Sequence, residues 1–186
     1  NQIQGFFDIP ADDITSMGLI GDYFNHKEGL GEVVVVSPDH GGTVRARNLA
    51  DILGAPVAII DKRRPKPNVA VAMNLLGDVK DKTAILIDDM VDTAGTLVSG
   101  VEMLKKQGAK EVYAACSHGV LSGPAVERLK NSGLKEFVCT DTIDQTENQK
   151  NLPNLVVLSI APLIAALIQA VETNSSLSVA LSHAFE

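Results

Sequence analysis

The chain has 186 residues, of which 45% are apolar and 21% are charged. This length and balance exclude a disordered or fibrous protein and predict one domain with a sizeable core. The net charge of −7 and the absence of tryptophan argue against a general nucleic-acid binder, because such proteins need a basic face and aromatic side chains for base stacking.

The longest apolar stretch, Leu155 to Ile168, is interrupted by Ser159 and Pro162. It falls short of the roughly 20 residues needed to cross a bilayer, so no contact with a membrane is expected. No secretory signal is readable. The two cysteines, Cys116 and Cys139, lie in apolar, strand-like surroundings. Reduced, buried thiols fit that pattern better than a disulfide, so we expect a cytoplasmic protein.

Residues 1–30 are less regular than the rest and contain three of the five phenylalanines. We expect them to form a docking segment, which packs either against this domain or against one outside the chain. Residues 31–186 are expected to form a single domain, because they contain no internal repeat and no low-complexity linker.

From residue 31 onward, short β-branched and apolar runs alternate with stretches in which apolar residues recur at helical spacing. This alternation predicts an α/β protein, in which a mostly parallel sheet is flanked by helices. The predicted strands are Val33 to Val36, Val57 to Ile60, Ala84 to Ile87, Val112 to Cys116, Phe137 to Thr140, and Val156 to Ser159.

Two helices have readable ends. Apolar residues recur at helical spacing over 46–53 and are followed by Gly54, a residue suited to the left-handed conformation at a helix C-terminus. The same pattern over 97–104 leads into two lysines and Gly108, which suit the negative end of the helix dipole and its cap. Two prolines lie where the first turn of a helix accepts proline, Pro124 and Pro162.

In an open α/β sheet, ligands bind beyond the carboxyl ends of the strands. The first loop in such a position is Ser37 to Thr43. Its adjacent glycines, Gly41 and Gly42, allow backbone N–H groups to turn toward an anion at a helix N-terminus. Asp39 adds a carboxylate that can hold a hard cation such as Mg²⁺.

An ordinary strand-to-helix turn explains this loop equally well. The helix that follows carries Arg45 and Arg47. Arginines at such positions are more often solvated than bound to a ligand, and we interpret both in that way.

The second loop, Asp61 to Asn68, holds four cations within five residues. Its two prolines are expected to keep it out of a helix or a central strand, so it is predicted to be an exposed loop. Lysine and arginine together suit phosphoryl transfer, in which Lys62 and Arg64 would neutralise charge on the transferring oxygens. A solubilising loop or a targeting-like basic patch is the alternative.

The third loop follows the strand that ends at Ile87. Asp88 and Asp89 can accept hydrogen bonds from vicinal sugar hydroxyls, and the small residues that open the next helix supply N–H and hydroxyl donors for a phosphate. Alternatively, Asp92 or Thr93 is only a helix N-cap. That alternative leaves the adjacent carboxylates unexplained, so a ribose-phosphate site is favoured. Its residues are Asp88, Asp89, Asp92, Thr93, Ala94, Gly95 and Thr96.

Together these segments resemble the ribose-phosphate pyrophosphokinase family. The resemblance runs in order along nearly the whole chain. It is carried by Gln4 to Pro10, Ser37 to Asp39, Asp61 to Pro65, Asp88 to Thr96, and Ser122 to Ala125. It implies a fold like that of the type I phosphoribosyltransferases.

The resemblance implies transfer of the diphosphoryl group of ATP to the 1-hydroxyl of ribose 5-phosphate, with Mg²⁺, giving phosphoribosyl diphosphate and AMP. It implies catalytic roles for Lys62 and Arg64, and ribose 5-phosphate binding by the third loop. It assigns the diphosphate to four residues of the first loop, with Asp39 as the Mg²⁺ ligand: Asp39, His40, Gly41 and Gly42. Ser176 and Ser178 loosely match a segment that binds phosphate or ADP allosterically in the family, and a frayed polar tail explains them equally well.

Only the second of the family's two half-domains is matched. The chain is therefore expected to work with an N-terminal half-domain that supplies contacts to ATP, and the docking segment is expected to continue from it. The family also implies a homo-oligomer built from dimers, such as a hexamer. Two alternatives are a phosphoribosyltransferase that uses phosphoribosyl diphosphate, which would not need the basic segment 61–65, and a non-catalytic regulatory partner, which would be expected to lose Lys62, Arg64 or Asp88.

Overall fold

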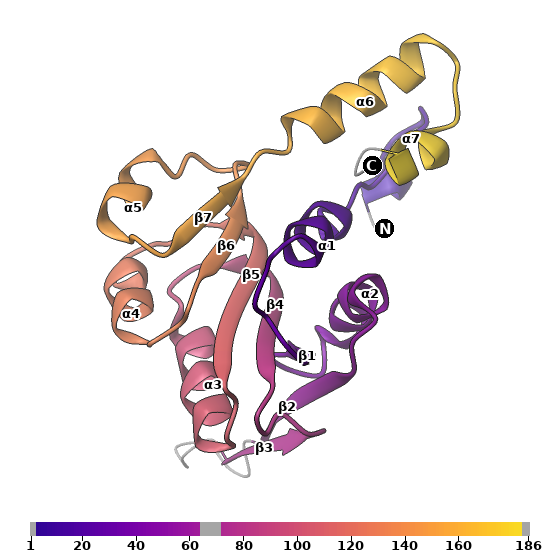
Figure 1. The fold of residues 1–186 in the computed structure, drawn as a ribbon. Coiled ribbons are helices and arrows are strands. Elements are labelled where there is room, and N and C mark those ends of the chain that lie inside the picture. Colours follow the sequence, from indigo (N-terminus) through magenta and orange to yellow (C-terminus); the bar gives the residue numbers. More distant parts are fainter. Residues whose placement is uncertain (1–2, 64–71, 184–186) are drawn as a thin grey trace.

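A computed structural model describes residues 3–63 and 72–183 of the chain. A seven-stranded sheet with the order β3-β2-β1-β4-β5-β6-β7 forms its centre (Figure 1). Neighbouring strands are parallel except for the β2–β3 pair, which confirms the predicted α/β fold with a mostly parallel sheet. The strands are β1 (Val33–Ser37), β2 (Val57–Arg63), β3 (Ala72–Leu76), β4 (Thr83–Val91), β5 (Glu111–Gly119), β6 (Phe137–Thr140) and β7 (Leu155–Leu158).

Helices cover both faces of the sheet, with α1 and α2 on one side and α3 and α4 on the other (Figure 1). No helix in the described part of the chain is long and apolar enough to cross a membrane. The helices are the 3₁₀ helix η1 (Ile3–Phe6), α1 (Met17–Asn25), α2 (Thr43–Leu53), α3 (Gly95–Lys106), α4 (Ala125–Asn131), α5 (Thr146–Asn151), α6 (Ala161–Glu172) and α7 (Leu177–His183).

The first part of the central strand β4, residues 83–87, is buried on both faces, which explains the apolar run there. Ile85 and Ile87 belong to the core beneath α1 and α2. Ala84 and Leu86 belong to the opposite core, beneath α3 and α4. Because successive side chains of a strand point to opposite faces, the part of the strand covered by two helical layers has no solvent-facing position for a polar residue.

The predicted helix ends are confirmed. Helix α2 ends at Leu53, and Gly54 takes the left-handed conformation with φ 59°. Helix α3 ends at Lys106, and Gly108 has φ 87°. A residue without Cβ adopts this conformation at little cost. Glycine can therefore end each helix in a geometry in which backbone N–H groups bond to free carbonyls of the last turn.

Helix α1 fixes the later part of the docking segment to this domain. Met17, Ile20 and Phe24 are buried in the core against α2 and the sheet. The Tyr23 hydroxyl donates to Glu136 Oε2 at 2.6 Å, and Lys27 Nζ donates to Glu136 Oε1 at 2.7 Å. The segment therefore docks onto its own sheet from residue 17 onward. Residues 3–10 are exposed.

The structure corrects the expectation that 61–68 is a loop. Residues 61–63 continue β2, and they pair antiparallel with β3, a strand that the sequence did not predict. The remainder of the basic segment, with Arg64, lies outside the described residues.

Candidate functional site

The loop after β1 and the end of β4 meet at the carboxyl edge of the sheet, because these two strands are parallel neighbours. They enclose a cavity of about 340 Å³. It is lined by Asp39, Asp88, Asp89, Met90, Val91, Asp92, Thr93, Ala94, Gly95, Thr96 and Leu97. One cavity thus brings together the sugar-phosphate residues predicted from the sequence and the predicted metal ligand, Asp39.

The adjacent carboxylates lie within β4 and not in a loop after it, since the strand extends to Val91. Arg45 of α2 bridges them: Nη1 lies 3.0 Å from Asp88 Oδ1, and Nη2 lies 2.7 Å from Asp89 Oδ2. The interpretation of Arg45 as a solvated residue is therefore wrong. Arg47 is exposed, as expected.

The two carboxylates differ in proton affinity. Burial raises the pKa of Asp88 to about 6, and Arg45 only partly opposes this rise. Burial also acts to raise the pKa of Asp89, but the Arg45 charge and the Met90 N–H outweigh it, so that this pKa is lowered. Near neutral pH both side chains are largely ionised. Ionised carboxylates accept hydrogen bonds only, which suits them to bind sugar hydroxyls.

The loop from Asp92 leads into α3 without a side chain that caps the helix. The N-cap of α3 is Ala94, with φ 60°, and no side chain caps the helix. The alternative that Asp92 or Thr93 serves as N-cap is therefore wrong. The first-turn N–H groups of a helix without a side-chain cap remain available to an anion.

Contacts from the next loop and helix hold this segment in place. The Ser122 hydroxyl donates to Asp92 Oδ1. Arg128 Nη1 donates to the Thr93 carbonyl at 2.9 Å. Ser122 lies in the connection between β5 and α4, and Arg128 lies in α4 itself, so the loop is supported by a neighbouring connection and helix as well as by its own helix.

The glycine loop is ordered by short contacts. The Gly42 N–H donates to Asp39 Oδ1 at 2.9 Å, and Ser37 Oγ donates to the Asp39 carbonyl at 2.6 Å. A Cβ at Gly42 would lie 2.9 Å from Ser37 Oγ, so glycine is needed here for close approach. His40 Nε2 lies 2.9 Å from Asp61 Oδ1, which joins this loop to the strand that leads to Lys62.

Asp39 fits a Mg²⁺ ion that is held mainly by its substrate. No group of three or more His, Cys, Asp or Glu side chains suited to a metal is found among residues 3–63 and 72–183. Mg²⁺ bound with nucleotides commonly keeps one or two carboxylates and takes its other ligands from phosphates and water. Asp39 is exposed and lies in the glycine loop, so its carboxylate fits an ion bound in this way.

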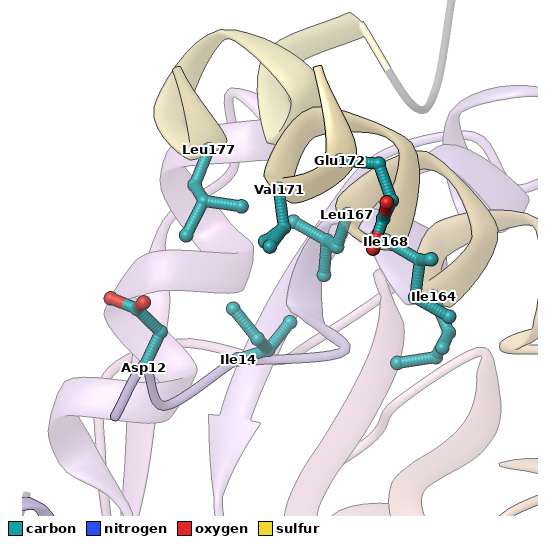
Figure 2. A pocket seen from close by; sticks show the side chains of 8 residues that line it. All are labelled: Asp12, Ile14, Ile164, Leu167, Ile168, Val171, Glu172 and Leu177. Atoms are coloured by element: carbon teal, nitrogen blue, oxygen red, sulfur yellow. The ribbon is translucent and has the colours of Figure 1, made fainter. Parts of the chain in front are cut away.

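A cavity beside the carboxylate pair and one beside the C-terminal helices were not predicted from the sequence. One, of about 310 Å³, lies between α6 and the ends of β4 and β5, and its lining includes Arg45, Asp89 and Ser117. The other, of about 360 Å³, is mostly apolar and lies between the N-terminal segment and the two C-terminal helices (Figure 2). It is lined by Asp12, Ile14, Ile164, Leu167, Ile168, Val171, Glu172 and Leu177. The apolar run of α6 was the only signal for it.

The C-terminal serines contribute to local structure. The Val179 N–H donates to Ser176 Oγ at 3.4 Å, within the first turn of α7. Ser178 lies inside the same helix. Neither serine lines the cavity that contains Asp39 and the β4 carboxylates.

Comparison with known proteins agrees with this geometry. The family model described as "Phosphoribosyl synthetase-associated domain" matches residues 43–182. The chain is 57% identical over 178 residues to a ribose-phosphate pyrophosphokinase of Halalkalibacterium halodurans, covering 96% of this chain and 56% of the relative. It is 54% identical over 181 residues to the enzyme of that name from Bacillus subtilis, with 97% and 56% covered.

Among solved structures, phosphoribosylpyrophosphate synthetase from Mycobacterium smegmatis is similar, with a TM-score of 0.84 and 45% identity. The match covers 94% of this chain and 56% of that one. The chain thus spans about half the length of the curated relatives it matches. The family model extends from the start of α2 to the end of α7 and so includes both strands that carry predicted site residues, β2 and β4. With most of its length matched in this way, the chain belongs to the phosphoribosyl synthetase-associated domain family.

Proposed function

We propose that this chain is the part of a ribose-phosphate diphosphokinase that binds ribose 5-phosphate and the Mg²⁺-bound diphosphate of ATP. One observation carries the proposal. The carboxylate pair of β4, the uncapped N-terminus of α3 and the Asp39 loop all border one cavity.

In this proposal Asp88 and Asp89 accept hydrogen bonds from the ribose hydroxyls. The 5-phosphate binds at Asp92 to Thr96, where first-turn N–H groups and threonine hydroxyls donate to its oxygens. The lack of a side-chain cap on α3 supports this placement, because the N–H groups there have no competing partner from a capping side chain.

The diphosphate of ATP is placed at the glycine loop, with Asp39 as a ligand of Mg²⁺. When bound, Mg²⁺ would offset charge on the transferring oxygens. The 1-hydroxyl oxygen of ribose 5-phosphate attacks the β-phosphorus and gives up its proton to solvent. The bond between the β-phosphorus and the oxygen that bridges to the α-phosphorus breaks, and AMP leaves with that oxygen. Lys62 and Arg64 are proposed to neutralise the charge that develops on these oxygens. The contact between His40 and Asp61 supports this placement, since it joins the glycine loop to the strand containing Lys62.

An N-terminal half-domain is the proposed partner, and it would supply the remaining contacts to ATP. Two surfaces support it. Phe6 and Phe7 are exposed, with Phe6 at 84%. Helix α6 extends away from the sheet (Figure 1) and, with α7 and the N-terminal segment, forms the apolar cavity of Figure 2. Burying such surface is favourable, so a folded partner is expected to cover it. Residues 1–30 would then continue from that half-domain.

We further propose that the protein forms a homo-oligomer built from dimers and that it is cytoplasmic. The free, buried cysteines support a reducing compartment.

The activity is tested by AMP formation from ATP in the protein that contains both half-domains. AMP should form only when Mg²⁺ and ribose 5-phosphate are both supplied. Lys62→Ala is expected to lower turnover by about 100-fold or more. An unchanged rate would contradict the role of Lys62.

The need for the half-domain is tested with residues 1–186 alone. This chain should bind ribose 5-phosphate in a calorimetric titration but turn over poorly. Full activity of the isolated chain would contradict this part of the proposal.

A further inference from the structure

Arg45 holds two adjacent carboxylates with the two arms of one guanidinium group. Its Nη1 and Nη2 lie 3.0 Å and 2.7 Å from Asp88 and Asp89, respectively. The Arg45 side chain is 24% exposed and that of Asp88 is 25% exposed. Ion pairs that are partly buried are less screened by salt than fully exposed pairs. The planar guanidinium group also fixes the orientation of both carboxylates that it contacts.

The guanidinium approaches the carboxylates from outside the sugar-phosphate cavity. That cavity is lined by Asp39 and by residues 88–97, whereas Arg45 lines the neighbouring cavity near Ser117. Asp89 borders both cavities. Arg45 therefore contacts the carboxylate pair from the side that faces away from the proposed ligand.

We infer that Arg45 is a positioning residue for ribose binding, which acts through Asp88 and Asp89 by fixing their carboxylates toward the sugar hydroxyls. This inference rests on the proposed function. Two neighbouring carboxylates repel each other, and without a cation between them one side chain would turn away or take up a proton. The guanidinium offsets that repulsion before the sugar binds, so less ordering is required on binding.

The same arginine links the two proposed substrate sites. It lies in the first turn of α2, directly after the glycine loop. A Cβ at Gly42 would lie 3.4 Å from Arg45 Nη1, so the loop packs closely against the guanidinium. The position of the diphosphate loop and the orientation of the ribose carboxylates are thus set by one helix N-terminus.

The inference is tested by calorimetric titration of residues 1–186 with three ligands: ribose 5-phosphate, 2-deoxyribose 5-phosphate and inorganic phosphate. The unchanged chain should bind ribose 5-phosphate most tightly, because only this ligand offers both hydroxyls to the carboxylates. Arg45→Gln should weaken ribose 5-phosphate binding by about tenfold or more and remove the preference over the deoxy sugar. Its affinity for phosphate should stay within about twofold, because the loop from Asp92 is untouched.

Two further variants separate positioning from charge and from folding. Arg45→Lys retains the positive charge but not the planar guanidinium group. Compared with Arg45→Gln, it should therefore recover only part of the preference for ribose 5-phosphate over the deoxy sugar. Arg47→Gln removes the same charge from the exposed side of the helix and should bind all three ligands as the unchanged chain does.

Several results would contradict the inference. It is wrong if Arg45→Gln keeps the full preference for ribose 5-phosphate. It is also wrong if sugar phosphate and phosphate affinities fall together, since that result indicates a general loss of structure. Failure of the unchanged chain to bind any of the three ligands would overturn the proposed function itself, and this inference with it.

Discussion

His40 Nε2 lies 2.9 Å from Asp61 Oδ1, and this contact connects the loop after β1 with the neighbouring strand β2. The Asp61 side chain is 13% exposed, whereas that of His40 is 64% exposed. A largely buried carboxylate therefore anchors an exposed loop residue. This loop, Ser37 to Thr43, is the one that we propose binds the diphosphate.

Replacing His40 by alanine should loosen the glycine loop without unfolding the domain. We expect diphosphate affinity to fall by about 3–10-fold, because part of the binding energy must then order the loop. The free energy of unfolding should change by less than about 0.5 kcal/mol, since His40 is mostly exposed. Titration with inorganic diphosphate measures the effect. His26→Ala, at the exposed end of α1, is the matched control. Equal diphosphate affinities of the two variants would contradict the proposed role of His40.

Because the pKa of Asp88 is raised, the stability of the folded chain is expected to depend on pH. Burial raises the pKa from 3.8 to about 6, so the folded chain binds this proton more tightly than the unfolded chain does. The stability that Asp88 contributes is therefore fully present below about pH 4 and is lost as the pH rises through 6. At pH 8 the ionised carboxylate should cost about 1–3 kcal/mol of stability.

Asp88→Asn should therefore raise the melting temperature at pH 8 more than at pH 5, while ribose 5-phosphate binding falls. Thermal unfolding of both proteins at the two pH values measures the first effect, and calorimetric titration measures the second. The same stabilisation at both pH values would show that Asp88 does not titrate in this range.

Glu136 is expected to hold α1 against the sheet. It accepts hydrogen bonds from Tyr23 and Lys27. The bond to Glu136 is the main reason that the pKa of Lys27 is raised. Glu136→Gln should lower the free energy of unfolding by about 1–2 kcal/mol, because charge-assisted bonds in a half-buried position are lost.

Chemical denaturation measures this loss. Glu147→Gln is the control, because its pair with Lys150 is exposed and should contribute less than about 0.5 kcal/mol. If the two variants are equally stable, the contact between α1 and Glu136 does not hold the segment.

Both cysteines are expected to be inert in the folded chain. Burial raises the pKa of the Cys139 thiol to about 12 and that of Cys116 well above its usual range. Since the thiolate is the reactive species, a dithionitrobenzoate reagent at pH 8 should modify neither thiol until the chain unfolds. In denaturant, both should react rapidly. Fast modification of either cysteine in the native chain would contradict this burial.

The parallel sheet and the helices bounded by glycine could be predicted from the sequence. The reason is local: a short apolar run such as Ala84 to Ile87 is typical of a strand buried on both faces, and Gly54 suits the left-handed end of a helix. The motif from Asp88 to Thr96 could likewise be assigned to the carboxyl edge of the sheet. Its position follows from the strand that precedes it.

The contacts between distant segments could not be predicted from the sequence and became visible only in the folded chain. Residues 61–63 form a strand because β3 supplies an antiparallel partner, and no property of the basic segment predicts that partner. Arg45 reaches Asp88 across 43 residues of sequence. Its spacing within α2 is equally suited to a solvated arginine. Periodicity shows which face of an element is buried, but an ion pair depends on which elements become neighbours, and that is fixed only when the sheet assembles.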